Sequence, residues 1–279
     1  MAFRAASLIL TLCAIVCSAG ARPWAEHSDS ASTAAPAPAT PAPNPGAGAG
    51  DFLERVRSAN EQLYSDLESF VCREEMTRYK GSLSGDKARQ IDTVTARVSF
   101  ENGTERYTEV RQNRQPRTTI AAVPGAWSEG EFGTLLRQTQ LLLKTQPVRY
   151  LGDSHVNDTP AAVYAFEVNE EDSPWDLAVG GQHYRIPFRT EVSVARDSGQ
   201  ILEIERTSVD VPPQTRISEV RWSVSLAPVD LNGRTWLLPR SGEYAVRYDE
   251  AGRREWNLLS FADYHRYGSE VALRFDDVK

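Results

Sequence analysis

The feature that most constrains the fold is a series of short segments within residues 190–275 in which apolar and polar residues alternate. A period of two is typical of a strand that buries one face. Nearly every segment ends at a turn signal, such as residues 197–199 or the Asn-Gly pair at 232–233. The pattern predicts an antiparallel meander that is apolar on one face and charged on the other.

Two helices are predicted upstream of this meander. Residues 51–70 place apolar side chains on one helical face, with Asp51 as the N-cap. A second helix is expected near residues 129–144, opened by the capping box of Ser128 and Glu131 and ended by Pro147. Residues 169–181 are acidic and contain glycines, which predicts an exposed loop. Further strands are predicted at residues 71–79, 91–100, 106–110, 148–152 and 161–168.

Residues 1–21 have the pattern of a secretory signal peptide. Arg4 precedes an apolar run, and small residues lead to a cleavage point after Ala21. The run is shorter than the roughly 20 residues that a membrane-spanning helix needs, so a retained anchor is the weaker alternative. Cys17 matches a lipid-attachment motif only poorly. The sequence therefore predicts an exported protein of the periplasm or cell envelope of a bacterium.

Residues 22–50 predict a disordered linker. They are dominated by Ala, Pro, Ser, Thr and Gly, which provide too little apolar surface to offset the entropy of ordering. The remaining residues, 51–279, are enough for one large β domain. Such a linker would hold this domain near a membrane or wall.

The cysteine content and the charge of the chain limit which disulfides and partners are possible. Two of the three cysteines lie in the signal peptide, so the mature chain keeps only Cys72 and cannot form an internal disulfide. The apolar neighbours of Cys72 predict a buried structural thiol. The net charge is −7, with acidic and basic residues interspersed, which argues against a nucleic-acid partner.

The sequence carries no recognisable catalytic or metal-binding motif. Its four histidines fall in separate regions, and none has a Cys or His partner at metal-ligand spacing. Neighbouring acids such as Glu74 and Glu75 would point to opposite faces of a strand. We therefore expect no catalysis, no cofactor and no metal. A hydrolase whose catalytic residues are scattered along the chain is the third alternative.

Aromatic residues in the strands instead favour an apolar cleft between a curved sheet and two helices. The period of two selects one face of each strand as candidate ligand lining. Trp222 is the leading candidate because it is the largest side chain of the most regular strand. The predicted lining residues are Val192, Val194, Leu202, Ile204, Val220, Trp222, Val224, Tyr244, Val246, Trp256 and Leu258. The alternative is that these side chains fill a closed core.

Three segments resemble a known superfamily. They are residues 194–202 (VARDSGQIL), 227–239 (APVDLNGRTWLLP) and 261–267 (FADYHRY). Their order is similar to that of the periplasmic lipoprotein-sorting (LolA/LolB-like) superfamily and its RseB-like sensor relatives. The resemblance implies an incomplete antiparallel β-barrel of about eleven strands, with helices plugging its concave face, and a role in holding acyl chains or a lipid-modified protein.

The leading hypothesis is therefore a non-catalytic exported carrier or sensor for an apolar ligand, meaning a lipid, an acyl chain or a lipoprotein. The alternative is a structural or protein-interaction module of the envelope with a filled core. The sequence leaves the ligand, the protein partner and the oligomeric state open.

Overall fold

The computed structural model describes residues 47–67, 70–82, 88–101, 104–231, 233–249 and 252–266. The predicted signal peptide and nearly all of the predicted linker lie outside these residues. So do Asn232 of the predicted Asn-Gly turn and residues 267–275 at the end of the predicted meander.

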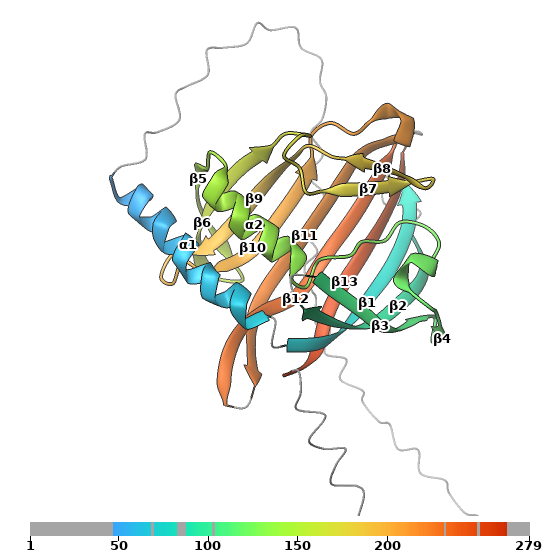
Figure 1. Cartoon of the computed structure of the whole chain (residues 1–279), viewed down its shortest axis with the longest axis horizontal. Helices are drawn as coiled ribbons and strands as arrows, with labels where there is room; N and C mark the ends of the chain where they lie inside the picture. The colour runs from blue at the N-terminus through green and yellow to red at the C-terminus, as the bar shows by residue number, and fades with distance from the viewer. Residues whose placement is uncertain are drawn as a thin grey trace, which may run out of the picture. The chain divides into compact units, whose positions relative to one another are not determined.

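Eleven antiparallel strands form one open, curved sheet (Figure 1). They are β1 (Phe70–Ser82), β2 (Arg89–Glu101), β3 (Thr104–Gln112), β4 (Gln115–Pro116), β5 (Arg149–Val156), β6 (Thr159–Val168), β9 (Phe188–Ala195), β10 (Ile201–Ser208), β11 (Ile217–Leu231), β12 (Arg234–Tyr248) and β13 (Arg253–Arg266). Their order is β4-β3-β2-β1-β13-β12-β11-β10-β9-β6-β5. The pairing of β1 with β13 brings the first and the last described strands together in the middle of the sheet. This architecture confirms the predicted fold class, an incomplete antiparallel β-barrel with packed helices.

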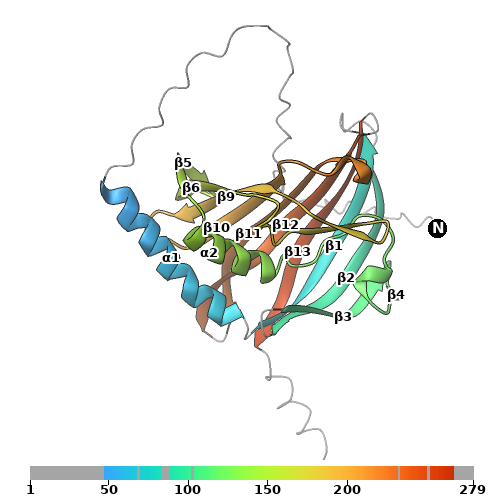
Figure 2. The same cartoon turned by 45° about the horizontal axis from the view of Figure 1, so that its top comes forward.

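Helices α1 (Ala47–Leu67) and α2 (Thr134–Thr145) lie on the concave side of the sheet (Figure 2). Phe52 and Val56 of α1 are buried, as the predicted apolar face requires. The helix begins before Asp51, so this residue lies inside it and is not the N-cap. Among the described residues, no helix combines the length and the apolar character needed to cross a membrane.

Helix α2 begins at Thr134 rather than near residue 129, and the predicted capping box does not form. The chain leads into the helix through Gly130, whose φ is +112°. The N-cap residue is Gly133, which has no side chain to cap the helix. Instead, Oε1 of Glu105 on β3 accepts the backbone N–H groups of Gly133 and Thr134 at 2.7 and 2.9 Å. A carboxylate here satisfies donors that a helix N-terminus leaves free. The cap therefore comes from a neighbouring strand.

The prediction of an exposed loop at residues 169–181 is wrong. This segment leads into a hairpin of β7 (Asp176–Val179) and β8 (Gln182–Arg185), and it buries Trp175 and Leu177. The Trp175 ring meets Phe188 edge to face, with centroids 5.7 Å apart. The acidic residues of this segment face solvent and mask the two apolar side chains that pack on the sheet.

Short 3₁₀ turns at Ile120–Ala122 and Pro213–Thr215 complete the described elements. The core lies between the concave face of the sheet and the segments packed on it. We call α2 together with residues 117–133 the cover. It contributes Ile120, Val123, Phe132, Leu135 and Leu143, all buried, to this core.

Candidate functional site

A row of buried side chains crosses the concave face, one from each of eight neighbouring strands. The pairing register places them next to one another, and side chains paired in this way point to the same face with Cβ atoms about 5 Å apart. We call this set the transverse row. Its members are Phe166 (β6), Thr190 (β9), Arg206 (β10), Trp222 (β11), Tyr244 (β12), Asn257 (β13), Arg78 (β1) and Asp92 (β2). None is more than 6% exposed.

At the β13–β1–β2 end of the row, the polar groups are paired. Nε and Nη2 of Arg78 donate to the two carboxylate oxygens of Asp92, at 2.6 Å each. Nη1 of Arg78 donates to the carbonyl oxygen of Pro124 at 2.8 Å, and Asn257 donates to that of Ala126 at 3.1 Å. Burial alone would raise the pKa of Asp92, but the hydrogen bonds from Arg78 and Gln112 hold it below its ordinary value. This end of the row fastens the cover to the sheet.

In the middle of the row, several donors have no partner. Arg206 is fully buried, and only its Nη1 is engaged, donating to Oε1 of Gln138 on α2 at 2.8 Å. Nε and Nη2 of Arg206 have no partner among the described residues. The hydroxyl of Thr190 and the indole N–H of Trp222, on the flanking strands, also lack a hydrogen bond of normal geometry within the described chain. Three adjacent strands thus present free donors on one face.

The Arg206 guanidinium is surrounded by aromatic rings. Its Cζ lies 4.1 Å from the ring centroid of Phe188, and 5.8 and 5.7 Å from those of Trp175 and Trp222. It forms no ion pair within the described part of the chain. Burial lowers its pKa to about 9, so the group still carries its charge at neutral pH. A buried charge without a counter-charge costs several kcal/mol.

Three carboxyl groups lie near the N-terminus of α2. They are Glu74, Glu105 and Glu131. Burial raises the pKa of all three, and neighbouring carboxylates raise those of Glu74 and Glu131 further, to about 8 for Glu131. Neither carboxylate oxygen of Glu131 has a hydrogen bond of normal geometry in the described structure, although Ser128 and Trp222 are near enough to oppose the rise. Glu131 is therefore largely protonated at pH 7 and supplies no counter-charge.

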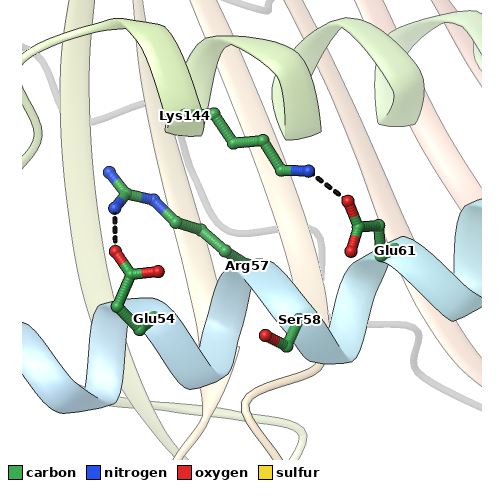
Figure 3. Close-up of a pocket in the computed structure, with 5 residues that line it drawn as sticks. All are labelled: Glu54, Arg57, Ser58, Glu61 and Lys144. Atoms are coloured by element: carbon green, nitrogen blue, oxygen red, sulfur yellow. Dashed lines mark hydrogen bonds and ion pairs between the residues drawn. The ribbon is translucent and has the colours of Figure 1, made fainter.

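The other end of α2 is held by α1. Nε and Nη2 of Arg57 donate to the carbonyl oxygen of Leu143 at 3.0 and 2.8 Å. Figure 3 shows the surface pocket between the two helices, of about 250 Å³, lined by Glu54, Arg57, Ser58, Glu61 and Lys144. Its cations and anions pair with each other, Arg57 with Glu54 and Lys144 with Glu61. Because these charges are mutually neutralised, we interpret the pocket as a polar seam between the helices.

Eight of the eleven predicted lining residues are buried in the core. They are Val192, Val194, Ile204, Val220, Trp222, Val224, Tyr244 and Val246. Leu202 lies at a bulge of β10 and is half-buried. Whether these side chains contact a ligand stays a prediction.

The predicted inward face of β13 is wrong. Its buried positions are Glu255, Asn257, Leu259 and Phe261, and the neighbours Trp256 and Leu258 lie on the convex face. There Trp256 stacks on Tyr79 at 5.4 Å, and Leu258 is 42% exposed. The prediction assumed that the apolar side chains of this strand face inward. In the structure, Glu255 and Asn257 face inward at this part of the strand because they bind the backbone of the cover at Ala126.

Sequence reasoning missed Thr190, Arg206 and Gln138. A usable signal exists for Arg206, which follows Ile204 by two residues and therefore shares its inward face. A charge at an inward position of a regular strand marks a special site. Cys72, in contrast, is buried as predicted, and burial raises the pKa of its thiol well above the ordinary value. Among the described residues, no three or more His, Cys, Asp or Glu side chains are arranged so that they could hold a metal ion.

The fold and the transverse row together define a class of protein, an open β half-barrel whose concave face is closed by a separately fastened cover. No family model and no curated protein matches the sequence. Two solved structures are similar in layout. One, from Vibrio parahaemolyticus, is described as an outer membrane lipoprotein-sorting protein domain; it has 11% sequence identity and a TM-score of 0.41 over 79% of this chain and 94% of that chain. The other, a DUF1329 family protein from Desulfovibrio piger, has 8% identity and a TM-score of 0.38 over 78% of this chain and 94% of that chain.

Proposed function

We propose that this protein is a non-catalytic carrier of the bacterial cell envelope that holds the apolar part of a ligand against the concave face of its sheet. The cover would move aside to admit the ligand, which would be a lipid, an acyl chain or a lipid-modified protein. The unsatisfied middle of the transverse row carries this proposal. Permanent cores pair or exclude buried polar groups, and this core leaves several unpaired beneath the cover.

The contacts that hold the cover suit reversible opening. Both ends of α2 are fastened by hydrogen bonds that involve charged side chains: Glu105 accepts them at one end and Arg57 donates them at the other. Such bonds contribute about 1.5 to 3 kcal/mol each, and water can replace them. The apolar face of α2, formed by Leu135, Leu142 and other buried side chains, packs where an acyl chain would lie. An acyl chain would therefore replace the lost contacts with similar ones.

Native mass spectrometry of the protein purified gently from its host tests the proposal. We expect a fraction of molecules to carry an added mass that organic extraction identifies as a lipid or acylated molecule. Glu105→Gln should loosen the cover and speed exchange of that ligand with added lipid. Glu109→Gln, an exposed residue of the same strand, is the matched control and should leave exchange unchanged.

An unliganded mass in every preparation, together with no uptake of added lipid by Glu105→Gln, would contradict the carrier function. Such a result would favour the alternative, a structural or interaction module with a filled core. The complete burial of Val192, Val194 and Val220 beneath the cover is the observation that favours this alternative.

A further inference from the structure

We propose that Arg206 binds the anionic head group of an amphiphilic ligand, a carboxylate or phosphate attached to an acyl chain, and that Gln138 of α2 holds the remaining Nη1 group of the guanidinium while the cover is closed. This inference rests on the proposed carrier function and specifies the ligand class for the same face of the sheet.

The two fully buried arginines of the sheet provide the first argument. Arg78 uses the edge formed by Nε and Nη2 to hold both oxygens of the Asp92 carboxylate. The same edge of Arg206 has no partner in the described chain. This edge is the one that matches a carboxylate or phosphate with two parallel hydrogen bonds. Arg206 is thus an anion-binding group without its anion.

The neighbours of Arg206 provide the second argument. The register pairs Arg206 directly with Thr190 on one side and Trp222 on the other. All three side chains point to the concave face. Nε and Nη2 of Arg206 and the hydroxyl of Thr190 have no partner among the described residues, and the indole N–H of Trp222 lies near Glu131 without a hydrogen bond of normal geometry to it. Two further donors beside a guanidinium edge suit a group with several acceptor oxygens. A neutral ligand would leave the guanidinium charge uncompensated.

The third argument concerns Gln138. Its Oε1 accepts the single hydrogen bond that the Arg206 guanidinium makes, and it does so from the cover and not from the sheet. An amide oxygen is a neutral acceptor, so it satisfies one N–H without neutralising the charge. When α2 moves away, Nη1 also becomes free for an anionic oxygen, which makes a stronger bond to the guanidinium than the neutral amide does. Opening of the cover and head-group binding are therefore coupled at the Arg206 guanidinium.

The surroundings also favour an amphiphile over a free anion. The aromatic rings around the guanidinium exclude water, and Val192, Ile204 and Val224, which the register places side by side, continue the inward face along the same strands. The nearby carboxyl group of Glu131 is largely protonated at pH 7, because burial raises its pKa to about 8, and so repels an anion little. An acyl chain can lie along the apolar positions while its head group reaches Arg206.

Equilibrium binding of three probes with the same twelve-carbon chain tests the inference: laurate, dodecyl phosphate and dodecanol. The exported protein should bind one or both anionic probes at least about tenfold more tightly than dodecanol, because a hydrogen bond to a charged group contributes enough for such a difference. The stronger of the two anions distinguishes a fatty carboxylate from a phosphate head group. Arg206→Met should abolish the preference for the anionic probes over dodecanol.

Arg206→Gln serves as a second variant, so the test does not depend on the folding of one protein. Arg149→Met, an exposed arginine of edge strand β5, is the matched control and should bind all three probes as the parent does. Equal binding of all three probes by the parent, or an anion preference that survives in both Arg206 variants, would overturn the inference while leaving the carrier function standing. Failure of the parent to bind any probe would instead contradict the carrier function itself.

Discussion

Replacement of Arg206 by methionine should stabilise the ligand-free protein, although it removes a fully buried side chain. Methionine has a similar length, fills irregular space well and carries no charge. Removing a buried, uncompensated charge is stabilising when an apolar side chain of similar volume takes its place.

The magnitude follows from the surroundings of Arg206. Burial lowers the pKa of its guanidinium to about 9, which corresponds to a cost of about 5 kcal/mol for holding the charge in this site. The substitution loses the hydrogen bond to Gln138, worth about 2 kcal/mol. It also loses the cation–π contact with Phe188, worth about 1 kcal/mol. The expected net gain in the free energy of unfolding is about 2 kcal/mol, or a rise of about 4 to 8 °C in Tm for a domain of this size.

Thermal and urea unfolding of delipidated protein measure this change. Arg78→Met is the matched comparison, and it should lower the free energy of unfolding by about 3 to 5 kcal/mol because it leaves Asp92 buried and unpaired. The two buried arginines should therefore respond with opposite signs. A clear fall in Tm for ligand-free Arg206→Met would refute the reasoning, since it would mean that the guanidinium is already satisfied in the closed state.

Two further predictions concern the cover. Gly130→Ala should lower the free energy of unfolding by about 1 to 3 kcal/mol, because φ of Gly130 is +112° and an added Cβ would lie 3.1 Å from the Trp222 ring. A midpoint of urea unfolding equal to that of the parent would contradict this. The free energy of unfolding should also decrease as pH rises. The folded state keeps a proton on Glu131 up to about pH 8, whereas the unfolded chain loses it near pH 4.5. The stabilisation is thus complete below pH 4.5 and is lost as pH rises towards 8. Glu131→Gln should flatten this dependence in melts at pH 5, 6.5 and 8, and an unchanged slope would contradict the assignment.

The strands were predictable because their signal is local. Alternation over residues 218–226 fixes the inward face of β11, and the burial of Val220, Trp222 and Val224 agrees with it. The same rule failed for β13, where inward polar residues bind the cover. An apolar pattern identifies an inward face only where the facing surface is itself apolar. Opposite Glu255 and Asn257 of β13, the facing surface is the polar backbone of the cover at Ala126.

The transverse row could not be predicted because it depends on register between distant segments. Arg206 becomes a neighbour of Thr190 and Trp222 only after three strands pair. The start of α2 has the same origin, since its capping carboxylate, Glu105, comes from β3. Local windows of the sequence show a capping box at Ser128 and an isolated charge at Arg206. In the assembled sheet, Glu105 caps the helix instead, and the neighbours of Arg206 give this charge its role.

Hydrogen exchange measured by mass spectrometry tests the central claim most directly, which is that the cover opens as a unit over an intact sheet. We predict that the amides of α2 exchange through an opening that costs less free energy than the exchange of β10 and β11, and that bound dodecyl phosphate alters the protection of α2 while leaving that of β3 unchanged. If α2 exchanges only with global unfolding, at the same free energy as the central strands and with no response to any probe, the concave face is a closed core and the account is wrong.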